Sequence, residues 1–91
     1  MLHQRFLISG KVQGVFFRKY TQAKALELKL NGAVRNLSTG QVEAWASGEE
    51  ESLMALEKWL WTGSPMCAVT NVEVFEAQKQ SWEGFQIIAS A

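Results

Sequence analysis

The chain has 91 residues, of which 47% are hydrophobic and 20% charged, with a single proline, and these values are typical of one globular domain spanning residues 1–91. They exclude a disordered or low-complexity chain. Nine basic and nine acidic side chains give zero net charge, which excludes a whole-molecule field that would attract nucleic acid or an anionic membrane, so any anion site must be local.

The first third of the chain predicts a strand followed by a helix. Residues 5–12 place Phe6, Ile8 and Val12 on one face and the polar Ser9 and Lys11 on the other, which is the periodicity of a strand. Residues 18–30 repeat apolar side chains at helical spacing among charged ones, which predicts an amphipathic helix. Asn31 and Gly32 tolerate the left-handed conformation, so we expect the helix to end there.

A hairpin and a second helix are predicted next. Residues 33–37 and 41–47 have the character of strands, and the connection between them contains Gly40. The segment Ser47-Gly48-Glu49-Glu50 resembles a capping box and predicts a helix that starts there, with leucines at spacings of three and four. Gly63-Ser64-Pro65 predicts its end.

The last part of the chain predicts extended structure over residues 68–78 and a short terminal strand over 85–89. The order strand, helix, strand, strand, helix, strand is the split βαβ arrangement of ferredoxin-like folds. In this α+β class both helices cover one face of a mainly antiparallel, four-stranded sheet, so each helix needs one apolar stripe. Both predicted helices have one.

The segment between the first strand and the first helix is the most informative about chemistry. A loop that leads into a helix presents unpaired backbone N–H groups, and a glycine such as Gly14 lets several of them face one anion. Arg18 adds planar donors that match phosphate oxygens. The residues alone leave open an alternative, in which Gly14 makes an ordinary turn and Arg18 is a solvated charge. The patterns GxxxxGK[ST] and GxGxxG are both missing, so a small phosphate fits better than a nucleotide.

Two motifs resemble those of a known family. Gly10-Lys11-Val12-Gln13-Gly14-Val15-Phe16-Phe17-Arg18 resembles the acylphosphatase signature GxVQGVxFR. Gly32-Ala33-Val34-Arg35-Asn36-Leu37-Ser38-Thr39-Gly40 is similar to the second signature of that family: a glycine, an aromatic, a small apolar residue, any residue, asparagine, three residues and glycine. The resemblance extends over essentially the whole chain. Ala33 is a departure, because the family usually has an aromatic there, and we expect Trp45 or Trp61 to fill the space.

The resemblance implies a free-standing acylphosphatase, an enzyme that hydrolyses the carboxyl-phosphate bond of small acyl phosphates. Inorganic phosphate would be its product or competitive ligand. The implied catalytic residues are Arg18, which binds the phosphate, and Asn36, whose side-chain amide orients the attacking water. Backbone N–H groups of the loop would complete the phosphate site, from Gln13, Gly14, Val15, Phe16, Phe17 and Arg18. No metal and no organic cofactor is implied.

The chemistry of the substrate explains why so few groups would suffice. An acyl phosphate is an activated mixed anhydride, so its hydrolysis needs positioning and charge stabilisation more than a strong base. The sequence places no histidine or carboxylate as a general base. We therefore hypothesise that a phosphate oxygen of the substrate accepts the proton from the water.

Other interpretations use the same residues. An asparagine before a turn often bonds its own backbone, and only the pairing with the Arg18 loop favours catalysis by Asn36. A ferredoxin-like domain can also be a binding module, although the strand motif of RNA readers is absent. A third interpretation is a phosphate-binding or carbamoyl-phosphate-binding module that works with a partner within a longer polypeptide. Because the chain begins at Met1 and closes its own fold, we favour the free-standing enzyme.

Other features of the sequence bear on disulfides, metal sites and the location of the protein. Cys67 is the only cysteine, so no internal disulfide or cysteine-based zinc site is expected, and His3 has no second metal ligand near it in sequence. The N-terminus lacks the apolar region of a signal peptide, and no stretch approaches the roughly 20 apolar residues of a transmembrane helix. We expect a soluble, cytoplasmic monomer without nucleic-acid or membrane partners.

Overall fold

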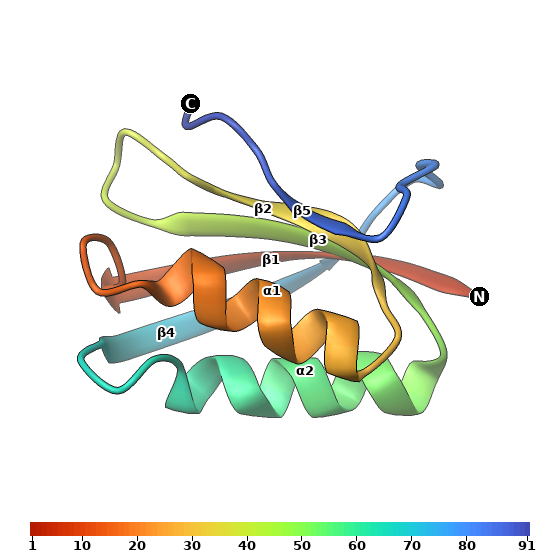
Figure 1. The fold of residues 1–91 in the computed structure, drawn as a ribbon, viewed down its shortest axis with the longest axis horizontal. Coiled ribbons are helices and arrows are strands. Elements are labelled where there is room, and N and C mark those ends of the chain that lie inside the picture. The colour runs from red at the N-terminus through yellow and green to blue at the C-terminus, as the bar shows by residue number, and fades with distance from the viewer.

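A computed structural model describes residues 1–91 as five strands and two helices. They follow the order β1 (Leu2–Lys11), α1 (Phe17–Glu27), β2 (Asn31–Asn36), β3 (Val42–Gly48), α2 (Glu50–Thr62), β4 (Ala68–Glu76) and β5 (Phe85–Ile87). The strands form one sheet in the order β4-β1-β3-β2-β5, and every neighbouring pair is antiparallel except β2 with β5. Both helices lie on one face of this sheet (Figure 1). The ferredoxin-like α+β fold is confirmed, with the short terminal strand added beside β2.

The core lies between the two helices and the covered face of the sheet. Phe6 and Ile8 of β1 are fully buried, whereas Arg5, Leu7 and Ser9, which alternate with them, are only partly buried. Leu53, Leu56 and Leu60 of α2 are also buried, and their spacing of three and four places them on the helix face toward the sheet. Burial of each such side chain contributes about 1.5–3 kcal/mol, so this apolar layer is the main support of the fold.

The predicted end of the first helix is wrong by one turn. α1 ends at Glu27, because Lys29 takes the left-handed conformation with φ 60° and Leu30 turns into the core. Asn31 and Gly32 do not cap the helix but begin β2. Gly32 is required there by close packing, since a Cβ would lie 1.8 Å from the carbonyl oxygen of Trp45.

The predicted capping box of the second helix is also wrong. The residue at the N-cap of α2 is Glu49, and it makes no side-chain capping bond. Ser47 lies within β3, where its hydroxyl is 2.6 Å from Nδ1 of His3 on β1. Glu50 and Glu51 do occupy the first turn, where negative charge is favourable. Neither helix is long and apolar enough to cross a membrane.

The alanine in the second motif has an aromatic neighbour. Ala33 is fully buried, and its cross-strand partner on β3 is Trp45. The Trp45 ring packs against Trp82 with the ring centroids 6.2 Å apart, and the guanidinium carbon of Arg35 lies 5.1 Å from the Trp45 centroid. Of the two tryptophans expected to fill this space, Trp45 occupies it, whereas Trp61 is half exposed on α2.

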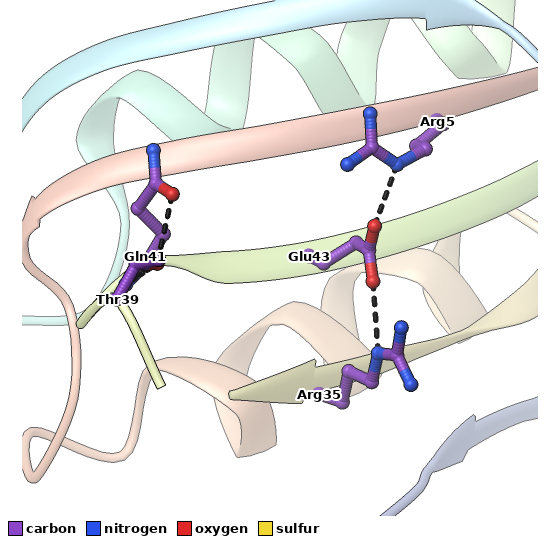
Figure 2. Close-up of polar contacts among 5 residues, drawn as sticks. All are labelled: Arg5, Arg35, Thr39, Gln41 and Glu43. Carbon is purple, nitrogen blue, oxygen red and sulfur yellow. Dashed lines mark hydrogen bonds and ion pairs between the residues drawn. The ribbon is translucent and has the colours of Figure 1, made fainter. Parts of the chain in front are cut away.

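A buried carboxylate links three strands on the face of the sheet away from the helices. Glu43 of β3 accepts a hydrogen bond of 2.6 Å from Nε of Arg5 on β1 and one of 2.8 Å from Nε of Arg35 on β2 (Figure 2). The Glu43 side chain is only 6% exposed, whereas those of Arg5 and Arg35 are about one-third exposed at 33% and 30%. This bridge therefore fixes β2, and with it Asn36 at the end of that strand, to the centre of the sheet.

Substitution Glu43→Ala should destabilise the protein by about 1–3 kcal/mol. It leaves two arginines close together without their shared carboxylate, and their partial exposure keeps the loss below that of a fully buried ion pair. The measurement is the midpoint of urea unfolding. Glu76→Ala is the matched control, because Glu76 is an exposed glutamate of β4 without an ion pair. Equal effects of the two substitutions would show that the bridge contributes nothing.

Candidate active site

The loop between β1 and α1 leaves a row of backbone donors unpaired. No backbone N–H from Gln13 to Lys19 donates a hydrogen bond to a backbone carbonyl, and the first helical N–H that does so belongs to Tyr20, which bonds the Phe16 carbonyl. Gly14 and Phe16 both have positive φ, of 73° and 59°. Such alternation of backbone conformation turns successive N–H groups toward a common centre, which is the geometry of an anion-binding loop.

Arg18 stands in the first turn of α1 with no compensating charge. The other two arginines, Arg5 and Arg35, are both paired with Glu43, whereas Arg18 forms neither a hydrogen bond nor an ion pair. No acidic residue occupies the first turn of α1. A guanidinium beside the partially positive end of a helix is unfavourable by itself, and an anion bound between the two would relieve the repulsion.

Asn36 is the last residue of β2, and its side chain is left without a partner. Its Oδ1 atom is buried and accepts no hydrogen bond. The interpretation in which the Asn36 side chain bonds its own backbone therefore does not describe this structure. A buried acceptor without a partner costs about 1–3 kcal/mol, so the Asn36 side chain has hydrogen-bonding capacity that the fold does not use.

A cleft of about 270 Å³ brings Arg18 and Asn36 together. Three other residues of the predicted loop line it, namely Gly14, Phe16 and Phe17. The two remaining loop residues, Gln13 and Val15, do not, and their side chains hold the loop in place. Val15 is buried in the core, and the Gln13 amide donates bonds of 2.8 and 2.9 Å to the carbonyls of Leu37 and Gln41.

The hydrogen bonds from Gln13 explain the position of the cleft. They join the β1–α1 loop to the hairpin between β2 and β3, and the two segments lie at the same end of the sheet (Figure 1). At the tip of that hairpin the Thr39 hydroxyl bonds the Gln41 side chain (Figure 2). The end of β2 is thus placed beside the start of α1, although the two are distant in sequence.

Three residues that line the cleft were not predicted from the sequence. Val12 and Lys19 flank the predicted phosphate-binding residues 13–18, and Ile87 comes from β5. The positive charge of Lys19 next to Arg18 could have indicated from the sequence that Lys19 lies at the anion site. Ile87 could not be predicted in this way, because it reaches the cleft only through the parallel pairing of β5 with β2. No histidine or carboxylate lines the cleft, and the structure contains no group of three or more histidine, cysteine or acidic side chains that could hold a metal ion.

The fold and the cleft together define a small α+β protein whose loop at a helix start has a geometry suited to an anion. A family model for acylphosphatase matches residues 4–87 of the chain. An acylphosphatase of Coxiella burnetii is 50% identical over 80 residues, which cover 88% of this chain and 84% of that relative. A crystal structure of acylphosphatase from Bacillus subtilis is 37% identical, with a TM-score of 0.92 and coverage of 97% of this chain and 99% of the other.

A larger protein contains a similar unit. Full-length HypF, in a crystal structure of its phosphate- and nucleotide-bound form, is 27% identical over 98% of this chain with a TM-score of 0.91, and the match covers 12% of HypF. The identity to HypF is well below that to the acylphosphatases. The comparison therefore favours the free-standing enzyme over a module of a larger protein.

The chain belongs to the acylphosphatase family. It is an enzyme that hydrolyses the carboxyl-phosphate bond of small acyl phosphates and releases a carboxylate and inorganic phosphate.

Proposed function

We propose that the cleft between the β1–α1 loop and the end of β2 is the catalytic site of this hydrolysis. Arg18 and the backbone N–H groups of residues 13–18 bind the phosphate, and Asn36 orients the attacking water. One observation supports this assignment most directly: the buried, unpaired Oδ1 of Asn36 belongs to the same cleft as the uncompensated guanidinium of Arg18. A side-chain amide with unused hydrogen-bonding capacity and a donor set for phosphate thus belong to one small space.

The reaction requires one displacement at phosphorus. The water, held by a hydrogen bond to the side-chain amide of Asn36, attacks the phosphorus atom from the side opposite the acyl oxygen. A new phosphorus–oxygen bond forms, the bond to the acyl oxygen breaks, and its electron pair leaves with the carboxylate. The proton of the water passes to a phosphate oxygen of the substrate. The absence of histidine and carboxylate from the cleft lining supports this route for the proton.

The protein's contribution is a set of donors fixed before the substrate arrives. Negative charge on the phosphoryl oxygens is distributed over three equatorial positions during the displacement. In this proposal the N–H groups of the loop and the guanidinium of Arg18 donate to the oxygens on which this charge develops. The bonds from Gln13 to the hairpin hold the loop in position. Donors that need no rearrangement during the reaction are the largest single source of rate enhancement in many enzymes.

Hydrolysis of benzoyl phosphate in water labelled with heavy oxygen tests this proposal. In the absence of added metal, we expect turnover with the label in inorganic phosphate and none in benzoate beyond the uncatalysed control. Label in benzoate would mean attack at the carbonyl carbon, for which this phosphate site is not arranged. A folded protein without turnover would refute the assignment of the cleft altogether.

The proposal extends to the domain organisation, location and partners of the enzyme. Residues 1–91 act as a single domain, because both helices share one hydrophobic core with one five-stranded sheet. The only cysteine, Cys67, is a free thiol, which suits a cytoplasmic protein. The enzyme acts as a monomer on a small-molecule substrate, with neither nucleic acid nor a membrane as partner.

A further inference from the structure

A second groove adjoins the cleft on the surface of α1. It has a volume of about 290 Å³ and is lined by Phe16, Lys19, Tyr20 and Ala23. Phe16 and Lys19 line the phosphate cleft as well, so the two spaces are neighbours that share these two side chains. Asn36 and Ile87 line only the cleft. The groove therefore adjoins the cleft at Phe16 and Lys19 and does not include Asn36.

The side chain of Phe16 is unfavourable for stability in two ways. The residue takes the left-handed conformation, with φ 59° and ψ 23°, which glycine adopts at lower cost. Its ring is 73% exposed and adds nothing to the core. The geometry of the anion loop explains the backbone conformation, but it does not explain a phenyl ring at that position.

Tyr20 follows one helical turn after Phe16, so the two side chains lie on the same side of α1. Tyr20 is 45% exposed, and its hydroxyl makes no hydrogen bond to the chain. Ala23 leaves an open floor beside Tyr20, and the methylene stem of Lys19 can border the groove while its ammonium stays in water. Two exposed aromatic side chains beside a polar cleft are suited to bind the apolar part of a ligand.

We propose that this groove is the subsite for the acyl group, and that it favours acyl phosphates with a flat apolar acyl group over short ones. The inference rests on the proposed function of the cleft. The acyl group is joined to the phosphate through one bridging oxygen, so it must occupy a space that adjoins the cleft. In-line attack places the acyl group away from the water, and the groove adjoins the cleft without including Asn36.

The test compares kcat/KM for benzoyl phosphate with kcat/KM for acetyl phosphate in the wild type and in Tyr20→Ala. The ratio should fall by roughly tenfold in Tyr20→Ala, mainly through a higher KM for benzoyl phosphate. Ala23→Leu, which fills the groove, should lower the ratio as well. Leu26→Ala is the matched control, because Leu26 is an exposed apolar residue of α1 that lines neither space, and its ratio should equal that of the wild type.

The possible failures are distinguishable. A wild type that hydrolyses neither substrate overturns the proposed function and the subsite with it. An active wild type whose ratio is unchanged by both Tyr20→Ala and Ala23→Leu overturns the subsite alone. If Leu26→Ala lowers the ratio as much as Tyr20→Ala does, the subsite is also overturned, because a change elsewhere on α1 would then have the same effect as a change in the groove.

Discussion

Replacing Arg18 by alanine should lower kcat/KM for benzoyl phosphate by roughly a hundredfold to a thousandfold or more while the protein stays folded. The substitution removes the only charged, two-pronged donor from the phosphate site and leaves the backbone N–H groups in place. Stability should not suffer, because Arg18 makes no bond to the rest of the chain and its charge lies at the unfavourable end of α1. Steady-state kinetics together with urea unfolding give both quantities.

Two further variants separate geometry from charge. Arg18→Lys keeps the positive charge but loses the planar fork, so its activity should lie between those of the wild type and Arg18→Ala. Lys58→Ala removes one positive charge from the exposed face of α2, outside the cleft, and should leave kcat/KM unchanged. If Arg18→Ala retains substantial activity, the phosphate is bound elsewhere.

The fold was predictable wherever local periodicity reports burial. The alternation along β1 and the leucine spacing in α2 both follow from the sequence, and together with the element order they define the sheet and its helix layer. The two errors have longer-range causes. Lys29, a residue without special preference for it, takes the left-handed conformation that lets Leu30 reach the core. Ser47 is held in β3 beside His3, which is 44 positions away in sequence.

The residues of the candidate site likewise fall into two groups, those that local sequence predicts and those that depend on tertiary packing. Arg18 and Asn36 were identified because each lies within a motif, and motifs are local in sequence. The side-chain bonds of Gln13 to the hairpin, the place of Ile87 in the cleft and the groove at Tyr20 depend on how strands and helix pack. Local pattern thus predicted the reacting groups, whereas their support and surroundings required the tertiary structure.

Replacing Asn36 by alanine should reduce kcat by roughly a hundredfold to a thousandfold without weakening the binding of phosphate. If Asn36 holds only the water, the inhibition constant of inorganic phosphate should equal that of the wild type. The same substitution should leave the free energy of unfolding unchanged or raise it, because it removes a buried acceptor that has no partner. This combination of lost turnover, intact phosphate binding and undiminished stability distinguishes a water-orienting residue from a structural one.

Asn31→Ala is the matched control, since Asn31 begins the same strand that Asn36 ends and lies outside the cleft. Its kcat should stay near that of the wild type. If Asn36→Ala weakens phosphate inhibition in proportion to the loss of kcat, Asn36 binds the phosphate and the water must be held by another group. If Asn36→Ala keeps its kcat, the unpaired Oδ1 has no part in the reaction, and the backbone N–H groups and Arg18 alone must account for the rate.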